Sequence, residues 1–292
     1  MTNKKLDTVV EDIYAKIAKL GEGKPIKVTD EQLDLFGDFM KEALKDWLTP
    51  RANKKPTLRM SNIGKPNRQL WFDMNSEHKP RGIPPEVMIK FLYGHMLERL
   101  VLFLTEISGH KVTDEQKEVK VGGILGHMDC KIDGEVVDIK SASNYAFNKF
   151  KNGTLPEDDS FGYIPQLAGY EHAEGTSNGG FLAINKETGE LALFKPEDLD
   201  KPNITDRIKK VKSQIKDSTP PDFCYQPIPD GASGNMKLAR GCTWCPHKFE
   251  CHKDSNDGEG LRVFKYAKGL NYLTNVVKEP KVEEITHRFI DG

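Results

Sequence analysis

The stretch that decides the fold runs from position 126 to position 140 and reads Gly126-His127-Met128-Asp129-Cys130-Lys131-Ile132-Asp133-Gly134-Glu135-Val136-Val137-Asp138-Ile139-Lys140. Its Asp133-Gly134 pair is a strong hairpin signal, because both residue types tolerate the backbone of a tight turn. We therefore expect two strands, the first carrying Asp129 and the second carrying Asp138 and Lys140. Since side chains alternate along a strand, Asp138 and Lys140 share one face, and the apolar residues between them point to the other.

A carboxylate and an ammonium two positions apart in an apolar strand are costly as a purely structural feature, because buried charge needs compensation. The same pair is well suited to holding a metal ion next to a reacting phosphate. Taken alone, Asp-x-Lys is a weak signal, and a cross-strand ion pair at a sheet edge also explains it. His127 shares a face with Asp129, but a histidine packed at the sheet surface is the simpler interpretation.

The composition limits which classes of protein the chain can belong to. The chain has 292 residues, 37% of them hydrophobic and 30% charged, enough for a sizeable core. The 43 Lys and Arg nearly balance the 44 Asp and Glu, so the net charge argues neither for nor against nucleic-acid binding. No apolar run approaches the roughly 18–20 residues of a membrane span, and the N-terminus has no apolar signal region. We therefore expect a cytoplasmic protein.

The first part of the chain predicts accessory helices. Apolar side chains recur with helical spacing over 6–20 and again after Asp30. A basic, proline-containing connector follows, with Arg51, Lys54, Lys55 and Arg59. It is typical of a solvated linker and, next to a nuclease site, of a phosphate-contacting segment.

The central part predicts alternating helices and strands. A short helix is expected from Pro66 and a long one from after Pro85 to about Gly109. Strands are expected at 113–121, 124–132, 135–141, 180–185 and 191–194, and helices starting at 158–160 and spanning 204–215. This order predicts an α/β sandwich with a central mixed β-sheet flanked by helices. The tail after about Lys278 has the composition of a linker.

Three carboxylates fall where these elements are expected to converge. Glu98 lies one turn after Gly94 on the long helix, and Asp129 and Asp138 lie on adjacent strands. Each alone is compatible with an ordinary surface charge. Together they offer oxygen ligands to the hard divalent ions that assist phosphodiester cleavage, often as two ions about 3.5–4 Å apart. Lys140 beside them could orient or deprotonate the water and offset phosphate charge.

The order of these residues resembles the PD-(D/E)XK nuclease superfamily, specifically its RecB-like branch. The matching motifs are Gly94-x3-Glu98, Gly126-x2-Asp129, Asp138-x-Lys140 and Gln166-x3-Tyr170. The resemblance spans about residues 58–255, and the segment 158–170 is similar to phage recombination exonucleases. It implies a restriction-endonuclease-like fold, with accessory helices at 1–55, a nuclease domain at 56–255 and a C-terminal extension at 256–292.

Roles carried over from the resemblance extend the site. Glu98, Asp129 and Asp138 would bind the metal together with the backbone carbonyl of Ile139, and Lys140 would be the catalytic lysine. The residues expected to support the site or contact DNA are Gln166, Tyr170, Arg68 and Tyr163. Arg68 and its neighbour Trp71 could equally pack and cap their helix. One departure is that Asp138 stands where many relatives have a longer Glu.

The resulting functional hypothesis is a Mg²⁺- or Mn²⁺-dependent DNA exonuclease of phage recombination or replication. Its partners would be DNA and a single-strand annealing or binding protein, in the host cytoplasm if the gene is phage-borne, with oligomerisation left open. The alternatives are a catalytically inactive DNA-binding or assembly module and a structure-specific endonuclease. The intact Asp129, Asp138 and Lys140 argue against the inactive module.

The cysteines form a second candidate site. Cys242, Cys245 and Cys251 lie within ten residues, a spacing that favours metal binding over packing. In iron–sulfur relatives a fourth cysteine lies far upstream, but Lys65, Pro66 and Asn67 occupy that position here. Cys224 or a histidine (His247, His252) could complete four ligands, for an iron–sulfur cluster or Zn²⁺. A metal-free knuckle is the third possibility, and Cys130 is interpreted as a small strand hydrophobe.

Overall fold

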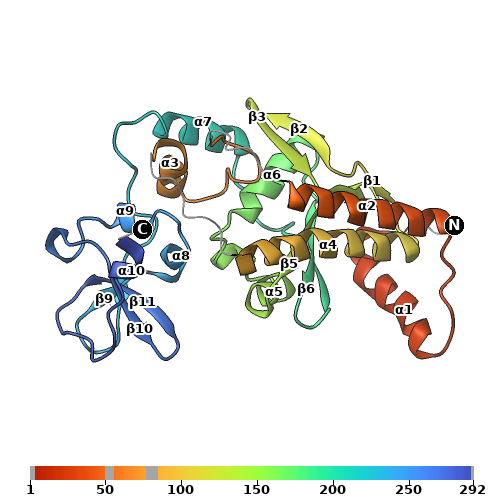
Figure 1. Ribbon diagram of the computed structural model, residues 1–292. Helices are drawn as coiled ribbons and strands as arrows, with labels where there is room; N and C mark the ends of the chain where they lie inside the picture. The colour runs from red at the N-terminus through yellow and green to blue at the C-terminus, as the bar shows by residue number, and fades with distance from the viewer. Residues whose placement is uncertain (1–3, 50–55, 77–84, 291–292) are drawn as a thin grey trace. The chain divides into compact units, whose positions relative to one another are not determined.

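The computed structural model describes residues 4–49, 56–76 and 85–290. Arg51, Lys54 and Lys55 of the basic connector lie outside these ranges. The chain divides into two compact units (Figure 1). Unit 1 comprises Met1–Gly64 and Arg81–Lys210, and unit 2 comprises Lys65–Pro80 and Val211–Gly292.

The centre of unit 1 is a five-stranded sheet in the order β1-β4-β5-β6-β7. Its strands are β1 (Val112–Thr113), β4 (Cys130–Ile132), β5 (Glu135–Ala142), β6 (Gly180–Asn185) and β7 (Leu191–Phe194). β5 and β6 are parallel, and the other neighbours are antiparallel. The predicted α/β fold with a central mixed sheet flanked by helices is therefore confirmed.

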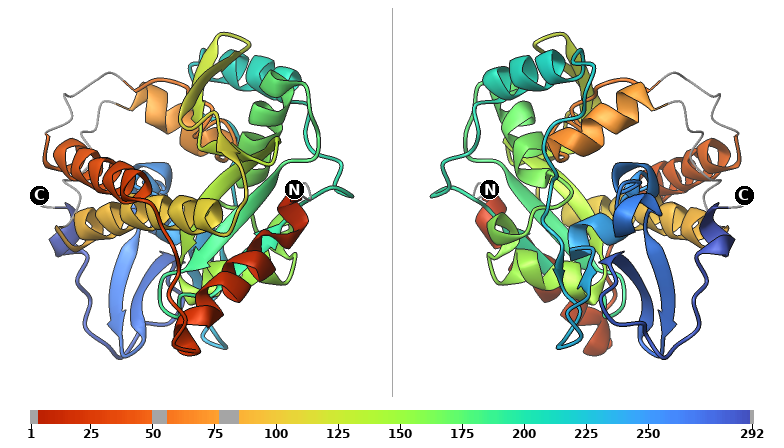
Figure 2. Two further views of the ribbon diagram at one scale, coloured as in Figure 1. Left: turned by 90° about the vertical axis from the view of Figure 1, so that its right-hand side faces the viewer. Right: turned by 90° about the vertical axis from the view of Figure 1, so that its left-hand side faces the viewer.

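Helices cover the sheet of unit 1. One apolar cluster joins the sheet to the short η1 (Leu6–Thr8), α1 (Val9–Gly21) and α4 (Pro85–Ile107). α2 (Asp30–Leu48) runs along α4, as both views of Figure 2 show. The remaining helical segments packed on this unit are α5 (Asn144–Lys151), η2 (Leu155–Glu157) and α6 (Tyr163–Glu174). Helices of the described ranges include none long and apolar enough to cross a membrane.

The N-terminal helices belong to the same compact unit as the sheet. Leu6, Val9 and Ile13 are buried in the main apolar cluster. The buried ring of His110 lies with Nδ1 2.6 Å from Asp133 Oδ2 and Nε2 3.1 Å from Asp12 Oδ2, joining α1 to the hairpin turn. These contacts make the helices part of one folded body.

Two strands that were expected to be continuous are each broken. The segment 113–121 splits into β1 and β2 (Lys117–Val121), because Asp114 and Gln116 adopt φ angles of 54° and 50°. The segment 124–132 splits at Asp129 into β3 (Ile124–Met128) and β4. β2 and β3 form a separate two-stranded sheet. The start expected for α6 also shifts, from 158–160 to Tyr163, after Gly162 in the left-handed region.

Glu174, the last residue of α6, fastens this two-stranded sheet to the main one. Its carboxylate lies 2.5 Å from Lys131 Nζ on β4 and 3.0 Å from Lys117 Nζ on β2. The hydrogen bond from Lys131, followed by that from Lys117, lowers the pKa of Glu174 below its usual 4.5.

We therefore expect Glu174→Gln to lower the free energy of unfolding at pH 7 by about 1–2 kcal/mol. A depressed folded pKa adds stability above the unfolded value of 4.5 and loses it as pH falls through the folded one. The difference between wild type and variant should therefore shrink below about pH 4.5. Urea titrations at several pH values measure it, with Glu42→Gln on the exposed side of α2 as control. A difference independent of pH would contradict this role.

Unit 2 contains a small sheet of its own, in the order β10-β11-β9-β8. Its strands are β8 (Ile228–Pro229), β9 (Met236–Lys237), β10 (Arg262–Tyr266) and β11 (Gly269–Asn275). The helical segments are α3 (Asn67–Asn75), α8 (Arg240–Thr243), α9 (Lys248–Cys251), η3 (Asn256–Gly258) and α10 (His287–Ile290), while α7 (Ile204–Gln214) spans the division between the units.

The C-terminal tail is an integral part of unit 2. Ile285 is buried in an apolar cluster with Leu261 and Val263, and Phe289 packs against the same cluster. The linker-like interpretation of the residues after Lys278 is therefore wrong for this stretch. The sequence signal was weak because only a few apolar side chains, spaced irregularly, anchor the tail.

Candidate functional site

Asp129 occupies the break between β3 and β4, and its carboxylate turns toward β5. Oδ2 accepts a hydrogen bond from the backbone N–H of Ile139 at 2.7 Å. The carbonyl oxygen of Asp129 accepts one from the backbone N–H of Gln116 at 3.0 Å. These two bonds hold the carboxylate beside the central strand.

Asp138 lies on β5, in the middle of the sheet. It is 1% exposed, and its Oδ1 has no hydrogen-bond partner. Lys140, on the same face of β5, forms an ion pair with Oδ2 of Asp138 and keeps 18% of its side chain exposed. A buried carboxylate with one unpartnered oxygen is costly to the folded state, so a purely structural role explains it poorly.

Glu98 reaches the same place from α4. Gly94, one turn earlier, faces β5, because a Cβ there would lie 3.5 Å from Ser141 Oγ. Glu98 Oε1 accepts a hydrogen bond from Gln116 Nε2 at 3.0 Å. Gln116 thus bonds to both Glu98 and Asp129, a role that the sequence interpretation missed because it read this residue as part of a strand.

The carboxylates of this cluster interact electrostatically. Burial raises the pKa of Asp129 well above its usual value, and the charges of Asp138 and Glu98 raise it further. Burial, and then Asp138, raise the pKa of Glu98 as well. Burial acts to lower the pKa of Lys140, but Asp138 and Asp129 raise it overall, so Lys140 is an ammonium. Three carboxylates thus lie near a single ammonium group, and a bound divalent ion would offset the excess negative charge.

The donor set fits such an ion by its chemistry. Carboxylate oxygens are the ligands that Mg²⁺ and Mn²⁺ prefer, and Oδ1 of the buried Asp138 lacks a hydrogen bond. Within the described ranges, no group of three or more His, Cys, Asp or Glu side chains is already arranged so that it could hold a metal ion. The site is therefore a set of converging carboxylates rather than a finished coordination shell.

Aromatic side chains lie beside Lys140. Its Nζ is 4.7 Å from the ring centroid of Tyr163, the first residue of α6. Phe161 stacks on Tyr163 with centroids 5.6 Å apart and is itself 61% exposed. Asp159 fixes this helix start, because its carboxylate accepts hydrogen bonds from the N–H groups of Tyr163 and Ile164, both at 2.8 Å. The sequence singled out Tyr163 but not Phe161 or Asp159.

Gln166 and Tyr170 lie behind the hairpin and are both buried. Gln166 Nε2 donates to the Tyr170 hydroxyl at 3.2 Å, and that hydroxyl donates to the carbonyl oxygen of His127 at 2.8 Å. This chain of bonds supports the strand that leads to Asp129. The His127 side chain is 57% exposed and lies 3.6 Å from Glu118.

Close backbone packing sets the position of α6. A Cβ on Gly126 would lie 2.4 Å from Met60 Cβ, and one on Gly169 would lie 2.1 Å from Met60 Sδ. Gly162 crosses Gly64 at backbone distance, with a Cβ on Gly162 falling 2.1 Å from the Gly64 carbonyl carbon. The Gly126 of the hairpin thus serves packing between β3 and α6.

Arg68, in unit 2, lies among the cysteines rather than in the acidic cluster. Its Nε donates to Cys251 Sγ at 3.1 Å, and its guanidinium lies over the rings of Phe223 and Phe72 at 4.3 and 5.6 Å. Trp71 Nε1 donates to the carbonyl oxygen of Asp217 at 2.9 Å. Both side chains therefore have packing partners within unit 2.

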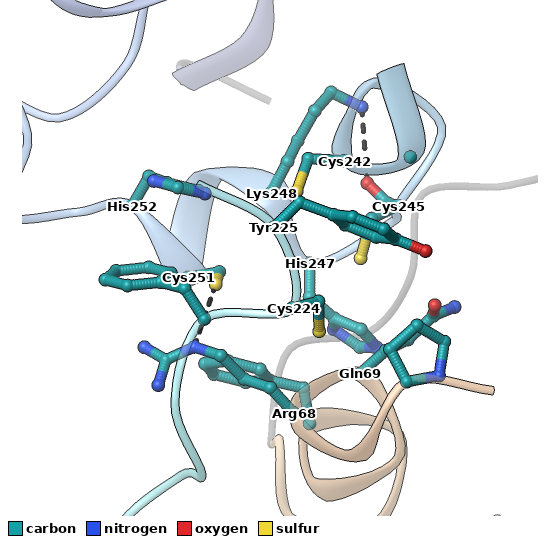
Figure 3. Close-up of a pocket in the computed structure, with 14 residues that line it drawn as sticks. Arg68, Gln69, Cys224, Tyr225, Cys242, Cys245, His247, Lys248, Cys251 and His252 are labelled. Carbon is teal, nitrogen blue, oxygen red and sulfur yellow. Dashed lines mark hydrogen bonds between the residues drawn. The ribbon is translucent and has the colours of Figure 1, made fainter. Parts of the chain in front are cut away.

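One pocket of unit 2 collects four of the five cysteines (Figure 3). They are Cys224, Cys242, Cys245 and Cys251, and all are free thiols. Burial, and then the other thiols, raise the pKa of Cys242 to about 12. Burial is also the main cause that raises the pKa of Cys245 to about 11. The fifth, Cys130, is fully buried in the core of unit 1, as a strand hydrophobe would be.

Two histidines line the same pocket. His247 Nε2 lies 2.7 Å from Asp73 Oδ1, and its ring stacks on Phe72. His252 stacks on Phe223, and its buried Nε2 has no hydrogen-bond partner. Burial, and then Arg68, lower the pKa of His252 to about 4, so its ring is neutral at pH 7.

Comparisons with known proteins add little to this geometry. No family model and no curated protein matches the chain. Among solved structures, the chain is similar to the crystal structure of SSO0001, with 16% identity, 73% of this chain and 94% of that chain covered, and a TM-score of 0.37. It is also similar to LHK-Exo in complex with dAMP, with 13% identity, 54% and 92% covered, and a TM-score of 0.32. The likeness to an exonuclease structure is weak, so we base the function on the site itself.

Proposed function

We propose that this protein is a divalent-metal-dependent deoxyribonuclease. The observation that carries the proposal is the buried carboxylate of Asp138, whose Oδ1 has no hydrogen-bond partner and which lies in an electrostatically coupled cluster with Asp129, Glu98 and Lys140. Three carboxylates beside one ammonium group destabilise the folded chain unless a further cation offsets the excess negative charge. Phosphodiester hydrolysis is the reaction that best uses clustered acids beside an ammonium.

Glu98, Asp129 and Asp138 would hold Mg²⁺ or Mn²⁺, with the backbone carbonyl of Ile139 as a further oxygen ligand. The bound ion would activate water and neutralise charge on the phosphate. Gln116 would orient Glu98 through its 3.0 Å hydrogen bond, while Ile139 N–H orients Asp129. These supporting bonds fix which carboxylate oxygens remain available.

Lys140 would stabilise the negative charge that develops on the phosphate. The neighbouring carboxylates raise the pKa of Lys140, so it carries a proton and is a poor base in this environment. Of the two roles suggested by the sequence, offsetting phosphate charge is therefore the better supported. Its partial exposure leaves the ammonium accessible to a substrate.

The finer proposal is an exonuclease of the RecB-like branch of the PD-(D/E)XK superfamily, acting in phage recombination or replication. The order of the four motifs and the similarity of segment 158–170 to phage exonucleases support it. So does the placement of the motifs on α4, the β3–β4 break, β5 and α6.

The test is digestion of end-labelled linear duplex, linear single-stranded and covalently closed circular DNA with Mg²⁺. An exonuclease degrades linear DNA from the labelled ends and leaves the circles intact. Nicking of the circles would instead favour the structure-specific endonuclease, and no cleavage of any substrate would favour the inactive module.

Phe161 is expected to stack on a base of the bound DNA, because it is an exposed aromatic that stacks on Tyr163, whose ring lies beside Lys140. Base–aromatic stacking contributes about 1–3 kcal/mol per base. Phe161→Ala should therefore raise KM for DNA roughly tenfold with little change in kcat, whereas Phe161→Trp should preserve KM. Steady-state kinetics measure both, with the exposed Leu20→Ala on α1 as control. Equal KM values for the alanine variants and wild type would exclude this contact.

A further inference from the structure

The ribbon of β2 and β3, drawn in yellow in Figure 1, has one buried face and one exposed face. The buried positions are Val119, Val121, Ile124, Gly126 and Met128. The exposed positions between them are Glu118, Lys120, Leu125 and His127. Since side chains alternate along a strand, these four share one outward face. His127 lies two residues before Asp129, so this face leads along β3 toward the acidic cluster.

A third extended segment continues the outward face beside β3. Arg59 pairs with Leu125 in a parallel bridge, and the backbone N–H of Met60 donates to the Leu125 carbonyl oxygen at 2.8 Å. Met60 is buried against Gly126, so the exposed Arg59 before it points to the outward side. Leu125 in turn pairs with Lys120 on β2. Arg59, Leu125 and Lys120 therefore form one row, with the two cations about 10 Å apart across three neighbouring segments.

Helix α7 adds a further cation at the turn of this ribbon. Its buried Ile208 faces the turn, because a Cβ on Gly122 would lie 3.1 Å from Ile208 Cγ2. The next residue, Lys209, keeps 78% of its side chain exposed. Its Nζ lies 3.5 Å from Asp206 on the same helix, and an exposed pair of this kind contributes little. Lys209 is therefore available to a partner that lies along the ribbon.

The charge of the outward face is mainly positive. Among the residues that the structure describes, no carboxylate pairs with Arg59 or Lys120, whereas Lys117 on the same strand is held by Glu174. The carboxylate among the four outward residues of the ribbon is Glu118, which lies 3.6 Å from His127 Nε2. Two cations without an internal partner can pair with the anionic groups of a ligand without first breaking an ion pair.

The distance of this row from the acidic cluster fits the phosphates of a nucleic-acid duplex. Leu125 lies four residues before Asp129, which corresponds to about 13 Å along an extended strand. Successive phosphates of one DNA strand advance by about 3.4 Å along the duplex axis. A strand with one phosphate at the acidic cluster therefore presents another phosphate to the row about four nucleotides away.

We propose that the outward face of the β2–β3 ribbon binds the phosphate backbone of double-stranded DNA, through Arg59 and Lys120, with Lys209 beside the turn. This inference rests on the proposed nuclease function, and it names duplex DNA as the substrate class. Contacts to phosphate position the DNA without reading its sequence. They also release counterions, so the affinity that this face contributes falls as the salt concentration rises.

The test is the salt dependence of duplex binding, measured by fluorescence anisotropy with a short labelled duplex in Mg²⁺. The parent protein carries Asp138→Asn so that the duplex stays intact. Arg59→Ala and Lys120→Ala should each reduce the slope of log affinity against log salt by about 0.9, the contribution of one phosphate contact. Lys120→Arg should keep the parent slope, as should the matched control Lys19→Ala, which removes an exposed lysine of α1.

Glu118→Gln guards against misreading a folding defect as lost binding. It removes the negative charge of the outward face, so it should bind the duplex about two- to fivefold more tightly, the range that one exposed charge contributes. Weaker binding by Glu118→Gln would overturn the proposal.

Unchanged slopes in both alanine variants, or a parent protein that does not bind the duplex, would also overturn the proposal. Cleavage assays with the otherwise wild-type chain separate this result from the nuclease proposal. Mg²⁺-dependent cleavage combined with unchanged slopes excludes this face alone. Reduced slopes without any cleavage by wild type would support the face and contradict the nuclease proposal.

Discussion

Replacing Lys140 by alanine is expected to slow DNA cleavage by roughly a hundred- to a thousandfold, the usual cost of removing one group that stabilises charge in a transition state. Lys140 is the ammonium that lies against Asp138 and that, in the proposed site, would offset the charge of the phosphate. Single-turnover rates on linear duplex with saturating Mg²⁺ measure the effect on the chemical step.

Lys151→Ala is the matched control, since Lys151 also pairs with a carboxylate, Glu190, but is 49% exposed and lies at the C-terminal end of α5 rather than on β5. It should cleave at the wild-type rate. Because Lys140→Ala leaves the Asp138 carboxylate without its ion pair, thermal unfolding of both variants must be compared. A folded Lys140→Ala variant with undiminished cleavage would remove Lys140 from the mechanism.

Replacing Gly162 by alanine is expected to lower the free energy of unfolding by about 3 kcal/mol or more. An alanine at φ +75° costs about 1–2 kcal/mol, and its Cβ would fall 2.1 Å from the carbonyl carbon of Gly64. Overpacking of the new Cβ against the backbone of Gly64 adds about 1–3 kcal/mol, because neither of the two crossing backbone segments can move aside without disturbing α6.

Gly175→Ala tests the same helix from its other end. Gly175 has φ +68°, but nothing lies within 4 Å of its Cβ position, so only the backbone cost of about 1–2 kcal/mol remains. Urea denaturation of the two variants separates clash from backbone strain. Equal losses in both would show that the crossing of Gly162 and Gly64 contributes nothing.

Much of unit 1 could be predicted because its elements have strong local signals. Pro85 and Gly109 bracket α4, and the Asp133-Gly134 turn marks the hairpin, with φ values of 52° and 92°. Alternation along β5 correctly placed Asp138 and Lys140 on one face. The approach of Glu98 to the strand acids also follows from these elements.

The strand breaks could not be predicted, because they depend on tertiary contacts. Asp114 and Gln116 adopt positive φ without glycine, and Asp129 leaves the ladder to bond to Ile139 N–H. No residue pattern marks either event. The break is nonetheless what turns the Asp129 carboxylate toward β5, so the least predictable piece of the fold shapes the candidate site.

The organisation of unit 2 could not be predicted from the sequence either. Its strands β8 and β9 have two residues each, too short for a periodic signal. Cys224 was only one candidate for the fourth ligand, since spacing alone cannot choose between a distant cysteine and two nearby histidines. Arg68 was assigned to DNA or to packing, and its bond to Cys251 depends on how α3 packs within unit 2.

The measurement that tests the central claim most directly is the Mg²⁺ dependence of linear-duplex hydrolysis by wild type, Asp138→Asn and Glu190→Gln. Glu190 is the control because it is a 40% exposed carboxylate on the turn before β7. We expect wild type and Glu190→Gln to degrade DNA only with Mg²⁺ or Mn²⁺, and folded Asp138→Asn to be slower by about a thousandfold. Divalent-dependent cleavage that is equal in all three proteins, or no cleavage by wild type, would contradict the assignment of this cluster as a nuclease site.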